Sequence, residues 1–369
     1  MRIVYLTFIT EECLGVYKKI NAQIKSLEKL TQNKVKECRL KNEILYFDKK
    51  KIGKYNCGEK IYQKILRKIQ IYLILKKLQN KELYKDLEYV YIRRFGATSS
   101  LINYLKFLKK LNKKIILEIA TYPYDNEIKN ENYFTKQDKI WRKEYYKYVD
   151  RVVTFSEDKE IWNIPCINIS NGIDLEDVKL IEKKEHNGIS FISVSQCHFW
   201  HGIDRFLDSL LQYRKNGGKE KIKFHIVGEG IETPKLKKIV EDNVELQEMV
   251  IFYGTKSGEE LEEIYNSSDV AIGSLARFRS GINTMKALKN REYCAKGLPM
   301  IYSESDLDFE GQNFIYKVSH DESLIDIEKV IRWYKNLKIL PNEIREYSKQ
   351  FSWDIQMKKV LDEIEGLKR

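Results

Sequence analysis

The sequence lacks the patterns that mark several common kinds of functional site. Its six cysteines are scattered with no Cys-x-x-Cys pair, so neither a zinc site nor a disulfide framework is indicated. No apolar run approaches the roughly 20 residues that would span a bilayer. Gly-x-Gly-x-x-Gly, the fingerprint of dinucleotide binding, is absent, and no histidine occurs in residues 1–184. The scattered cysteines favour a protein of the reducing cytoplasm.

Length and composition indicate a globular protein of two domains. The chain has 369 residues, of which 43% are hydrophobic and 33% are charged, which is enough to bury two full cores. Its net charge is +12, mostly from lysine. Such a charge is typical of proteins that meet nucleic acid, anionic lipid or phosphorylated substrates. A lysine-rich composition bias would give the same excess without any function, so charge alone leaves the partner open.

The N-terminal half begins with a strand, a loop and a helix. An apolar strand is expected over 3–8 and a helix over 16–30, with Gly15 between them. This order suits a Rossmann-like domain, in which a glycine after the first strand lets the backbone approach a ligand. Gly15 is therefore a candidate ligand-binding residue, although a plain turn would also use a glycine.

A basic stretch follows at residues 49–77, with ten Lys or Arg and one Glu. Five apolar residues recur in it at helical spacing: Ile61, Ile65, Leu66, Ile69 and Leu73. A basic amphipathic helix of this kind is found at anionic membrane surfaces. A helix whose apolar face packs on a core while its basic face is solvated has the same pattern. The sequence does not decide between the two.

Further along, strands are expected over 87–93 and 114–119, with a helix between them. The second strand runs into a loop at its carboxyl end, where doubly wound folds place ligands. That loop holds three carboxylates that could bond a substrate hydroxyl, and they are the candidate catalytic residues: Glu118, Asp125 and Glu127. Two tyrosines beside a proline could form a platform on which a sugar stacks. A polar surface loop would show the same residues.

The most informative stretch of the sequence is Lys286–Tyr302. It predicts a helix that ends at Gly297, because glycine tolerates positive φ, and then a turn at Pro299 and a short apolar strand. Lys289 and Glu292 are three residues apart and therefore share one face of the helix. An ammonium that meets phosphate beside a carboxylate that accepts ribose hydroxyls would suit a phosphorylated sugar. An exposed ion pair on an ordinary helix would have the same spacing.

One motif within this stretch connects the chain to a known family. The motif is Lys289-x-x-Glu292-Tyr293-x-Ala295-x-Gly297-x-Pro299. It resembles the donor segment of the GT-B glycosyltransferases, in the group called family 4 or glycosyl transferases group 1. The resemblance implies that Glu292 binds the ribose of a nucleotide sugar and that Lys289 lies by its pyrophosphate.

Other segments resemble the same family in their order and spacing. Ser170–Asp174 is similar to the Asn-Gly-(Val/Ile)-Asp segment that closes the first domain. Gly228 and Gly230 follow an expected strand and resemble the Val-Gly-x-Gly turn, whose glycines let the loop pass close to a ligand. After the next strand, the resemblance places the nucleobase against Thr255 and Lys256.

The chain also departs from the family. Relatives usually carry an Arg and a Lys that grip the diphosphate after the first strand of the second domain, whereas this chain has Gln196 and His201. A family glutamate eight residues before the ribose-binding one is replaced by Thr284. Gly281 nearby could still direct backbone N–H groups at a phosphate or a sugar. A family histidine near the loop 118–127 is absent, so a catalytic histidine is not carried over.

The expected fold is α/β, with two Rossmann-like domains facing across a cleft (GT-B). The acceptor-binding domain is expected at 1–182 and the nucleotide-sugar (donor) domain at 183–369, with a polar linker near the boundary. Phe351-Ser-Trp353 resembles the start of the family's last helix. Residues from about 350 to 369 are therefore expected to pack back on the N-terminal domain.

The expected activity is transfer of a sugar from a nucleoside-diphosphate sugar, with uridine as the expected base. The acceptor would be a hydroxyl of a glycan or lipid-linked molecule in bacterial-type surface polysaccharide synthesis. The resemblance implies retention of the anomeric configuration. No Asp-x-Asp metal motif is expected near the donor segment, and no metal ion or other cofactor is expected. Helix N-terminal amides and Lys289 would stabilise the leaving diphosphate instead. The expected location is the cytoplasm, at the inner face of the membrane, with no nucleic acid as partner.

Two other classes of protein fit parts of the sequence. A GT-B-like sugar-nucleotide epimerase would use the same donor grip but consume the donor without an acceptor. A non-catalytic protein that binds a membrane or nucleic acid would account for the net charge of +12, with an affinity that falls steeply with salt. The ordered donor motifs favour the transferase over this second class.

Overall fold

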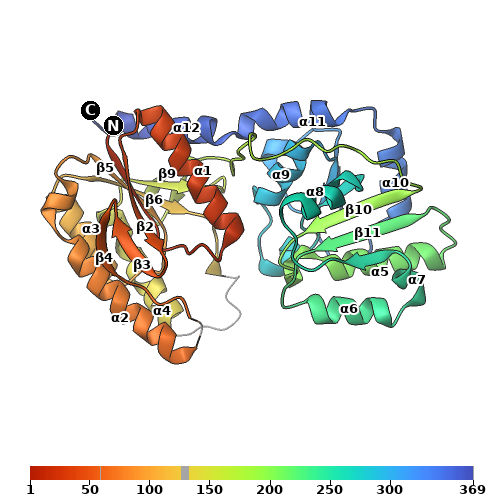
Figure 1. The fold of residues 1–369 in the computed structure, drawn as a ribbon, viewed down its shortest axis with the longest axis horizontal. Helices are drawn as coiled ribbons and strands as arrows, with labels where there is room; N and C mark the ends of the chain where they lie inside the picture. The colour runs from red at the N-terminus through yellow and green to blue at the C-terminus, as the bar shows by residue number, and fades with distance from the viewer. Residues whose placement is uncertain (59, 126–132, 369) are drawn as a thin grey trace. The chain divides into compact units, whose positions relative to one another are not determined.

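The chain forms two compact units, each with its own core. The structure, a computed structural model, describes all residues except 59, 126–132 and 369. Unit 1 consists of Met1–Ser170 together with Trp353–Arg369, and unit 2 consists of Asn171–Ser352. The chain therefore builds most of unit 1, then all of unit 2, and returns to unit 1 with its last helix (Figure 1).

Unit 1 is built on a mostly parallel sheet. Its strands are β1 (Ile3–Leu6), β2 (Val35–Lys41), β3 (Ile44–Phe47), β4 (Lys50–Lys54), β5 (Tyr89–Arg93), β6 (Lys114–Ile119), β7 (Arg151–Thr154), β8 (Glu160–Ile161) and β9 (Ile164–Asn168). Within the described residues the sheet has nine strands in the order β4-β3-β2-β1-β5-β6-β7-β9-β8. The central strands from β2 to β9 are parallel, and β3, β4 and β8 pair antiparallel with their neighbours.

Helices cover both faces of this sheet. They are α1 (Leu14–Thr31), α2 (Ile61–Leu78), α3 (Ser99–Lys110), α4 (Tyr133–Trp141) and α12 (Trp353–Glu365). Successive side chains in a strand point to opposite faces, so Val4 packs in the core with α2 and α3 while Tyr5 packs with α1 and α12. Figure 1 shows the two helix pairs on opposite sides of the sheet. None of the helices that the structure describes is both long and apolar enough to cross a membrane.

Unit 2 is a parallel sheet with the doubly wound strand order. Its strands are β10 (Ile189–Val194), β11 (Ile222–Val227), β12 (Val250–Phe252), β13 (Val270–Ile272), β14 (Met300–Tyr302) and β15 (Ile315–Lys317). They lie in the order β12-β11-β10-β13-β14-β15, and every pair is parallel. The order reverses between β10 and β13, and in such sheets ligands bind beyond the carboxyl ends of the strands at this reversal.

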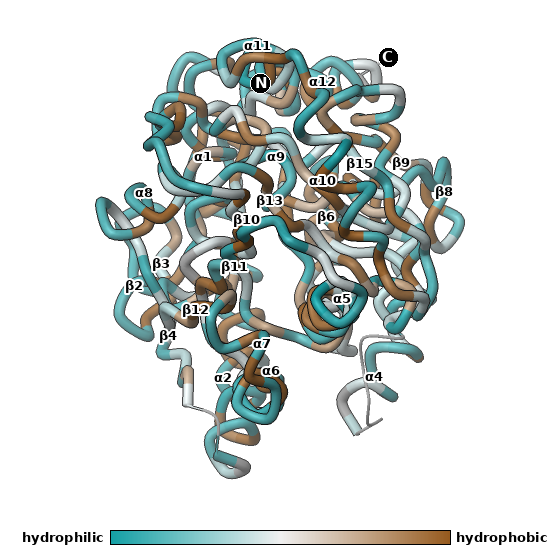
Figure 2. The backbone as a smooth tube through the Cα atoms, turned by 90° about the vertical axis from the view of Figure 1, so that its right-hand side faces the viewer, coloured by the Kyte–Doolittle hydropathy of each residue, from teal (hydrophilic) through white to brown (hydrophobic). Residues whose placement is uncertain are grey.

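The helices of unit 2 also form two layers. They are α5 (Ile203–Lys215), α6 (Thr233–Glu241), α7 (Val244–Gln247), α8 (Gly258–Asn266), α9 (Leu288–Lys296), α10 (Ile327–Asn336) and α11 (Pro341–Ser348). Phe191 packs in the core with α5, α6, α7 and α10, and its neighbour Ile192 packs with α8, α9 and α11. Figure 2 shows α5 changing between hydrophobic and hydrophilic along its length, as expected for a helix with one buried face.

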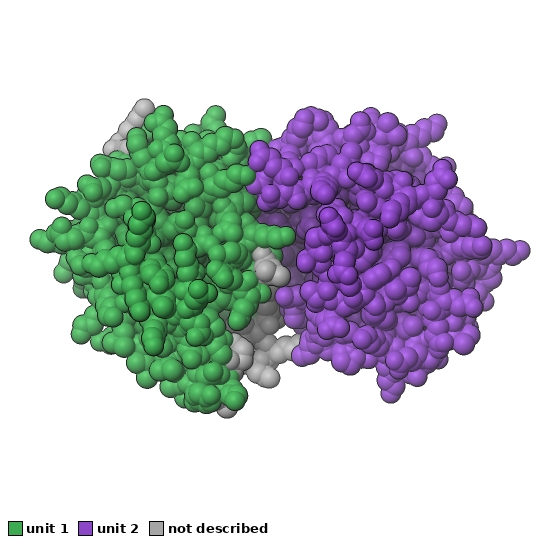
Figure 3. Space-filling model, in the orientation of Figure 1, with its two compact units in different colours: residues 1–170, 353–369 green, residues 171–352 purple. Residues whose placement is uncertain are grey.

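The division between the units falls at Ser170 and again at Ser352 (Figure 3). Residues 171–182, which the sequence analysis assigned to the first domain, pack in unit 2: Ile181 is buried in its core, and its N–H donates to the carbonyl of Lys296 at 3.0 Å. Strands β2, β3 and β4 were not expected from the sequence. The turn between β2 and β3 has no glycine, and its two residues adopt positive φ, 48° at Asn42 and 57° at Glu43.

Candidate functional site

The candidate site lies at the carboxyl ends of the central strands of unit 2. The loop after β10 leads to Gly202, and the loop after β13 begins at Gly273. These loops touch, because the N–H of Leu275 donates to the carbonyl of His201 at 2.9 Å. Gly202 has a φ of 65°, and a Cβ there would lie 2.9 Å from the backbone nitrogen of Ala276. A glycine is therefore required where the two loops meet.

The Gly-Glu-Gly turn after β11 packs equally closely on the loop after β10. A Cβ at Gly230 would stand 1.6 Å from the carbonyl oxygen of Gln196, and one at Gly228 would stand 2.1 Å from that of Ser195. Both glycines are thus needed for the packing of the two loops. Their predicted contact with a donor stays a prediction.

Lys289 brings a buried positive charge to this place. Its Nζ atom has no hydrogen-bond partner among the described residues. Burial, opposed by the attraction of Glu304 and aided by the repulsion of Arg277, lowers the pKa of Lys289 to about 8. Burying a charge without a hydrogen-bonded partner is costly, so this ammonium is suited to receive an anion.

The buried side-chain polar atoms of unit 2 that lack a hydrogen-bond partner, the Nζ of Lys289 included, gather around the same strand ends. All of those identified in the structure belong to four residues: Ser193, Lys289, Asn290 and Glu304. Ser193 lies near the end of β10, Asn290 follows Lys289 on α9, and Glu304 comes just after β14. Nearly all buried polar groups in folded proteins are hydrogen-bonded. Buried polar atoms without a partner, clustered at the carboxyl ends of parallel strands, are typical of a binding site for a polar ligand.

Glu304 is the residue of this cluster that the sequence analysis missed. Its side chain is fully buried, with 0% exposed, and burial raises the pKa of its carboxyl group. Its charge acts on Lys289 and Lys317, since in both cases its attraction opposes the fall in pKa that burial causes. The sequence gives no sign of this burial, because a glutamate between two serines reads as a polar loop.

Gln196 and His201 both lie in the loop after β10. Gln196 is exposed. Nδ1 of His201 accepts a hydrogen bond from the N–H of His198 at 3.1 Å. Burial, with the nearby charges of Lys289, His198 and Arg277, holds the pKa of His201 well below its ordinary value. A neutral His201 that accepts at Nδ1 carries its proton on Nε2, so it offers an N–H donor in the loop after β10.

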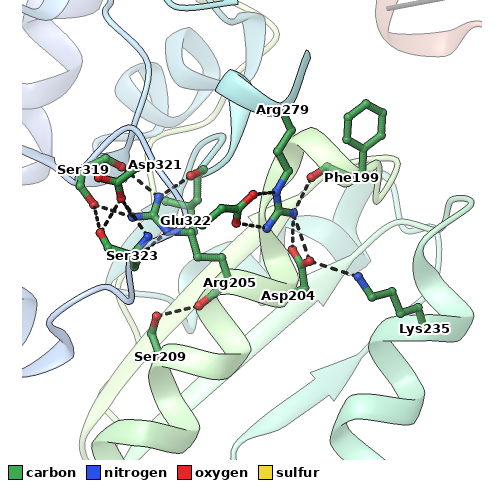
Figure 4. Close-up of polar contacts among 11 residues, drawn as sticks. Phe199, Asp204, Arg205, Ser209, Lys235, Arg279, Ser319, Asp321, Glu322 and Ser323 are labelled. Carbon is green, nitrogen blue, oxygen red and sulfur yellow. Dashed lines mark hydrogen bonds and ion pairs between the residues drawn. The ribbon is translucent and has the colours of Figure 1, made fainter. Parts of the chain in front are cut away.

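Two other arginines beside the site are already engaged (Figure 4). Arg279 pairs with Asp204 at 2.8 Å and Glu322 at 2.6 Å, and donates to the carbonyl of Phe199 at 2.9 Å. Arg205 is buried and donates to three carbonyls: Leu275, Ser319 and Ser323. These contacts tie the loops after β10 and β13 together, so both arginines act on the shape of the site.

Helix α9 holds Lys289 and Glu292 as the sequence predicted. It ends at Gly297, whose φ is 80°. Tyr293 on the same helix fixes it to the strand ends, because its hydroxyl accepts from the N–H of Val194 at 3.0 Å and donates to the carbonyl of Ile272 at 3.3 Å. Glu292 is half-buried, and the hydroxyl of Tyr265 lies 3.5 Å from its carboxylate.

The expectation that no Asp-x-Asp motif stands near the donor segment was wrong, because Asp306 and Asp308 have this spacing, which many metal motifs share. The fully buried Arg291 pairs with both carboxylates, and Lys286 lies 3.5 Å from Asp308. Both aspartates are therefore neutralised by cations of the chain itself. Among the described residues, no group of three or more His, Cys, Asp or Glu is placed to hold a metal ion.

The remaining donor candidates of unit 2 lie in two surface loops. Thr255 is exposed, and Lys256 pairs with Glu260 at 2.8 Å. Their loop lies beside the Gly-Glu-Gly turn, since the carbonyl of Gly254 accepts from the N–H of Gly228 at 2.7 Å. The N–H of Gly281 donates to the carbonyl of Phe278 at 2.8 Å, inside its own turn. The predicted contacts of these residues with a donor stay predictions.

In unit 1 the structure places Glu118 inside the protein, with 0% exposed. Its carboxylate receives hydrogen bonds from Tyr91 at 2.6 Å and Gln23 at 2.9 Å, pairs with Arg93, and lies 3.6 Å from the Nζ of Lys19. Burial alone would raise the pKa of Glu118, but Arg93 and Lys19 outweigh it and hold the pKa below its ordinary value. The carboxylate of Glu118 in β6 therefore connects β5 with α1, and it does not face solvent.

The other candidates of unit 1 are more exposed. Arg142 forms two hydrogen bonds with the carboxylate of Asp125, at 2.8 and 2.9 Å, and these lower the pKa of Asp125. Tyr124 lies under the guanidinium of Arg94, 3.9 Å from the ring centroid, so one of the rings considered for sugar stacking is already covered on one face. Gly15 lies in the first turn of α1 with open space beside it. Glu127 lies outside the described residues.

The chain is similar to known glycosyltransferases. Residues 176–350 match the family described as glycosyl transferases group 1. No curated protein matches the sequence. Among solved structures, a glycosyltransferase from Rickettsia africae ESF-5 has a TM-score of 0.62 at 13% identity, covering 100% of this chain and 98% of that one. The lipopolysaccharide outer core galactosyltransferase WaaB has a TM-score of 0.62 at 14% identity, covering 100% of both chains.

A third solved structure is an epimerase. The UDP-GlcNAc 2-epimerase from Neisseria meningitidis, bound to UDP-GlcNAc, has a TM-score of 0.53 at 13% identity and covers 100% of both chains. At such identities the solved structures show a shared fold. Together with the two parallel sheets, they confirm the predicted fold class of two Rossmann-like domains in the GT-B manner.

Proposed function

We propose that this chain moves a sugar from a nucleoside-diphosphate sugar to a hydroxyl of a glycan or lipid-linked acceptor. Its fold is that of the GT-B glycosyltransferases, and its residues 176–350 match the glycosyl transferases group 1 family. The observation that carries the proposal is the buried ammonium of Lys289, which has no hydrogen-bond partner at the strand ends of unit 2. A diphosphate would provide the missing partner, and the half-buried Glu292 on the same helix would accept hydrogen bonds from the ribose.

In the proposed reaction the bond between the anomeric carbon and the diphosphate oxygen breaks, and the diphosphate leaves with the electron pair. The acceptor oxygen forms a new bond to the same carbon and loses its proton, which the departing diphosphate or solvent takes up. Negative charge therefore grows on the leaving group, where Lys289 and the N–H donor of His201 would stabilise it. A preorganised cation is effective there because the protein has already met the cost of burying it.

The finer features of the proposal follow the family resemblance. We propose that the base is uridine, that the anomeric configuration is retained and that no metal ion is required. The similar epimerase is bound to UDP-GlcNAc, which supports uridine. The similar WaaB is a lipopolysaccharide galactosyltransferase, which supports a role in surface polysaccharide synthesis. Such an acceptor would place the chain in the cytoplasm at the inner face of the membrane.

The test of the proposal is a transfer assay with purified variants. Lys289→Ala and Glu292→Ala are expected to abolish release of the nucleoside diphosphate from a panel of nucleotide sugars supplied with lipid-linked acceptors. Lys238→Ala and Glu245→Ala are matched controls, since both residues are exposed on α6 and α7. Wild-type turnover by either folded site variant would contradict the proposal.

The second candidate is a sugar-nucleotide epimerase, favoured by the full-length similarity to the solved epimerase. It would use the same donor grip but release no nucleoside diphosphate as its main product. Incubation with the nucleotide sugar alone separates the two activities. Accumulation of an isomeric sugar nucleotide without an acceptor would assign the chain to this second class.

A further inference from the structure

Helix α2 of unit 1 carries a stripe of apolar side chains that faces solvent. Six large hydrophobic residues of this helix are 41–63% exposed and recur at helical spacing: Tyr62, Ile65, Leu66, Ile69, Tyr72 and Leu73. We call them the α2 stripe. Single exposed apolar residues are ordinary on a protein surface, but a contiguous stripe on one helix marks an interaction surface.

The opposite face of α2 fixes this orientation. At its C-terminal end, Ile74, Leu75 and Leu78 are at most 1% exposed and pack in the core of unit 1. Nearer its N-terminus, Arg67 donates to the carbonyls of Asn56, Cys57 and Gly58 at 2.6–2.9 Å. The stripe therefore points outward, and in the N-terminal half of α2 a polar arginine points inward, which is unlike an ordinary surface helix.

The surroundings of the stripe are basic. The sequences of α2 and α3 contain no acidic residue. A groove of about 440 Å³ separates the two helices, and its lining includes two aromatic rings and three lysines: Tyr72, Phe107, Lys76, Lys106 and Lys110. The three lysine side chains are exposed and form no hydrogen bond or ion pair with any described residue. The groove thus joins apolar surface to uncompensated positive charge.

We infer that α2 is the surface through which this chain binds an anionic lipid membrane. The helix would lie along the bilayer surface, with the stripe inserted among acyl chains and the lysines of the groove against lipid phosphates. Apolar residues with flanking lysines and no acidic residue are the features of helices that bind in this way. At 1.5 Å per residue, a helix of this length is roughly 27 Å long, enough to contact several lipids.

This inference rests on the proposed work at a lipid-linked acceptor, and its test is independent of sugar transfer. The full chain is floated with vesicles of phosphatidylcholine and phosphatidylglycerol, and with vesicles of phosphatidylcholine alone. We expect binding to the first kind only, and we expect added salt to weaken it, because salt screens attraction to the anionic surface. Equal binding to both kinds, or to neither, would overturn the inference.

Matched variants locate the surface. Ile69→Glu is expected to lower partition to the anionic vesicles about tenfold or more, since it places a charge where an apolar side chain would insert. Val244→Glu in unit 2 is the control, because Val244 is exposed even more, 71% against 54% for Ile69. Lys106→Glu with Lys110→Glu is expected to remove the preference for the anionic vesicles. Wild-type binding by the Ile69 variant would overturn the inference.

The same variants distinguish other occupants. A dimer that forms in solution without lipid and is lost in Ile69→Glu would assign the stripe to a second copy of the chain, and would overturn the membrane inference. Ile69 and Val244 are both exposed. We therefore expect Ile69→Glu and Val244→Glu to unfold at the temperature of the wild type, which checks that the fold is intact. Nucleotide binding by unit 2 is measured on the same samples. The membrane inference and the donor proposal are therefore tested separately, and failure of one is distinguished from failure of the other.

Discussion

Lys289 holds a positive charge where the fold gives it no hydrogen-bond partner. Its pKa is lowered from 10.5 to about 8, chiefly by burial. At neutral pH the charged lysine therefore costs the folded state free energy, and this cost fades as pH rises from about 8 toward the unfolded value. A group that destabilises the fold and sits at the end of a parallel sheet is best explained by the ligand it receives.

Replacing Lys289 by methionine is expected to separate function from stability. Lys289→Met removes the ammonium and keeps the length of the side chain, so affinity for a nucleoside diphosphate should fall about ten- to a hundredfold. The unfolding temperature should stay level or rise, since Glu304, whose pKa burial already raises, can take up a proton once the attraction of the Lys289 ammonium is gone. Calorimetric titration and thermal unfolding of this variant and Lys238→Met check the two effects.

Binding of a diphosphate is expected to weaken as pH rises above about 8. An anion favours charged Lys289 and so raises the pKa above the value of about 8 in the free protein. Between those two pKa values the complex holds one more proton than the free protein, and affinity falls by up to about tenfold per pH unit. Titrations from neutral to alkaline pH check this. A flat profile for the wild type, or the same slope in Lys289→Met, would contradict the assignment.

At the scale of elements, glycines decide how closely the loops of the site pack. A Cβ at Gly230 would come within 1.6 Å of the carbonyl oxygen of Gln196, whereas a Cβ at Gly15 would meet nothing within 4 Å. The two glycines are therefore not equivalent, although the sequence marks both as candidate ligand contacts. Gly230 allows two loops to pack closely, whereas Gly15 only lies in the first turn of α1.

Alanine substitutions are expected to show this difference. Gly230→Ala should destabilise unit 2 by about 3 kcal/mol or more, because the backbone must shift to admit the methyl group. Gly15→Ala should stabilise the chain by about 0.5–1 kcal/mol, because alanine is the better residue in a helix. Chemical denaturation measures both. A loss of transfer in a stable Gly15→Ala protein would show that the backbone at Gly15 approaches the substrate.

Elements with a strong local pattern were predictable, and those fixed by distant contacts were not. The run Ile189–Val194 is continuously apolar or small and reads as a buried parallel strand, and β10 covers it. The β2–β3 turn uses Asn42 and Glu43 in place of a glycine, so no hairpin signal was visible. The residues of the site show the same difference in how far the sequence predicts them. The spacing of Lys289 and Glu292 is a local pattern, whereas the burial of Glu304 depends on the sheet around it.

At the scale of the whole molecule, the chain builds two units and completes the first with its last helix. Trp353, Met357 and Val360 of α12 pack with α1 and the strands of unit 1. The hydroxyl of Tyr89 donates to the carbonyl of Ile364 at 3.2 Å. Unit 1 is therefore incomplete without residues that follow the whole of unit 2 in the sequence.

This arrangement predicts that the two units respond separately to core substitutions. Met357→Ala should destabilise unit 1 by about 2–5 kcal/mol, since Met357 is 0% exposed and its loss leaves a cavity. Unit 2 has its own cores and should keep its stability and its nucleotide binding. Hydrogen exchange read by peptide mass spectrometry reports each unit by itself. Equal loss of protection in peptides of both units would contradict separate cores.

The measurement that tests the central claim most directly is thermal unfolding of the wild type and of Lys289→Met with UDP, GDP, ADP and CMP, without added metal. A ligand that binds only the folded state raises its stability by mass action. We predict that one nucleoside diphosphate, UDP, selectively stabilises the wild type and that Lys289→Met loses this effect. No stabilisation by any of the four, or equal stabilisation of both proteins, would contradict a diphosphate site at Lys289.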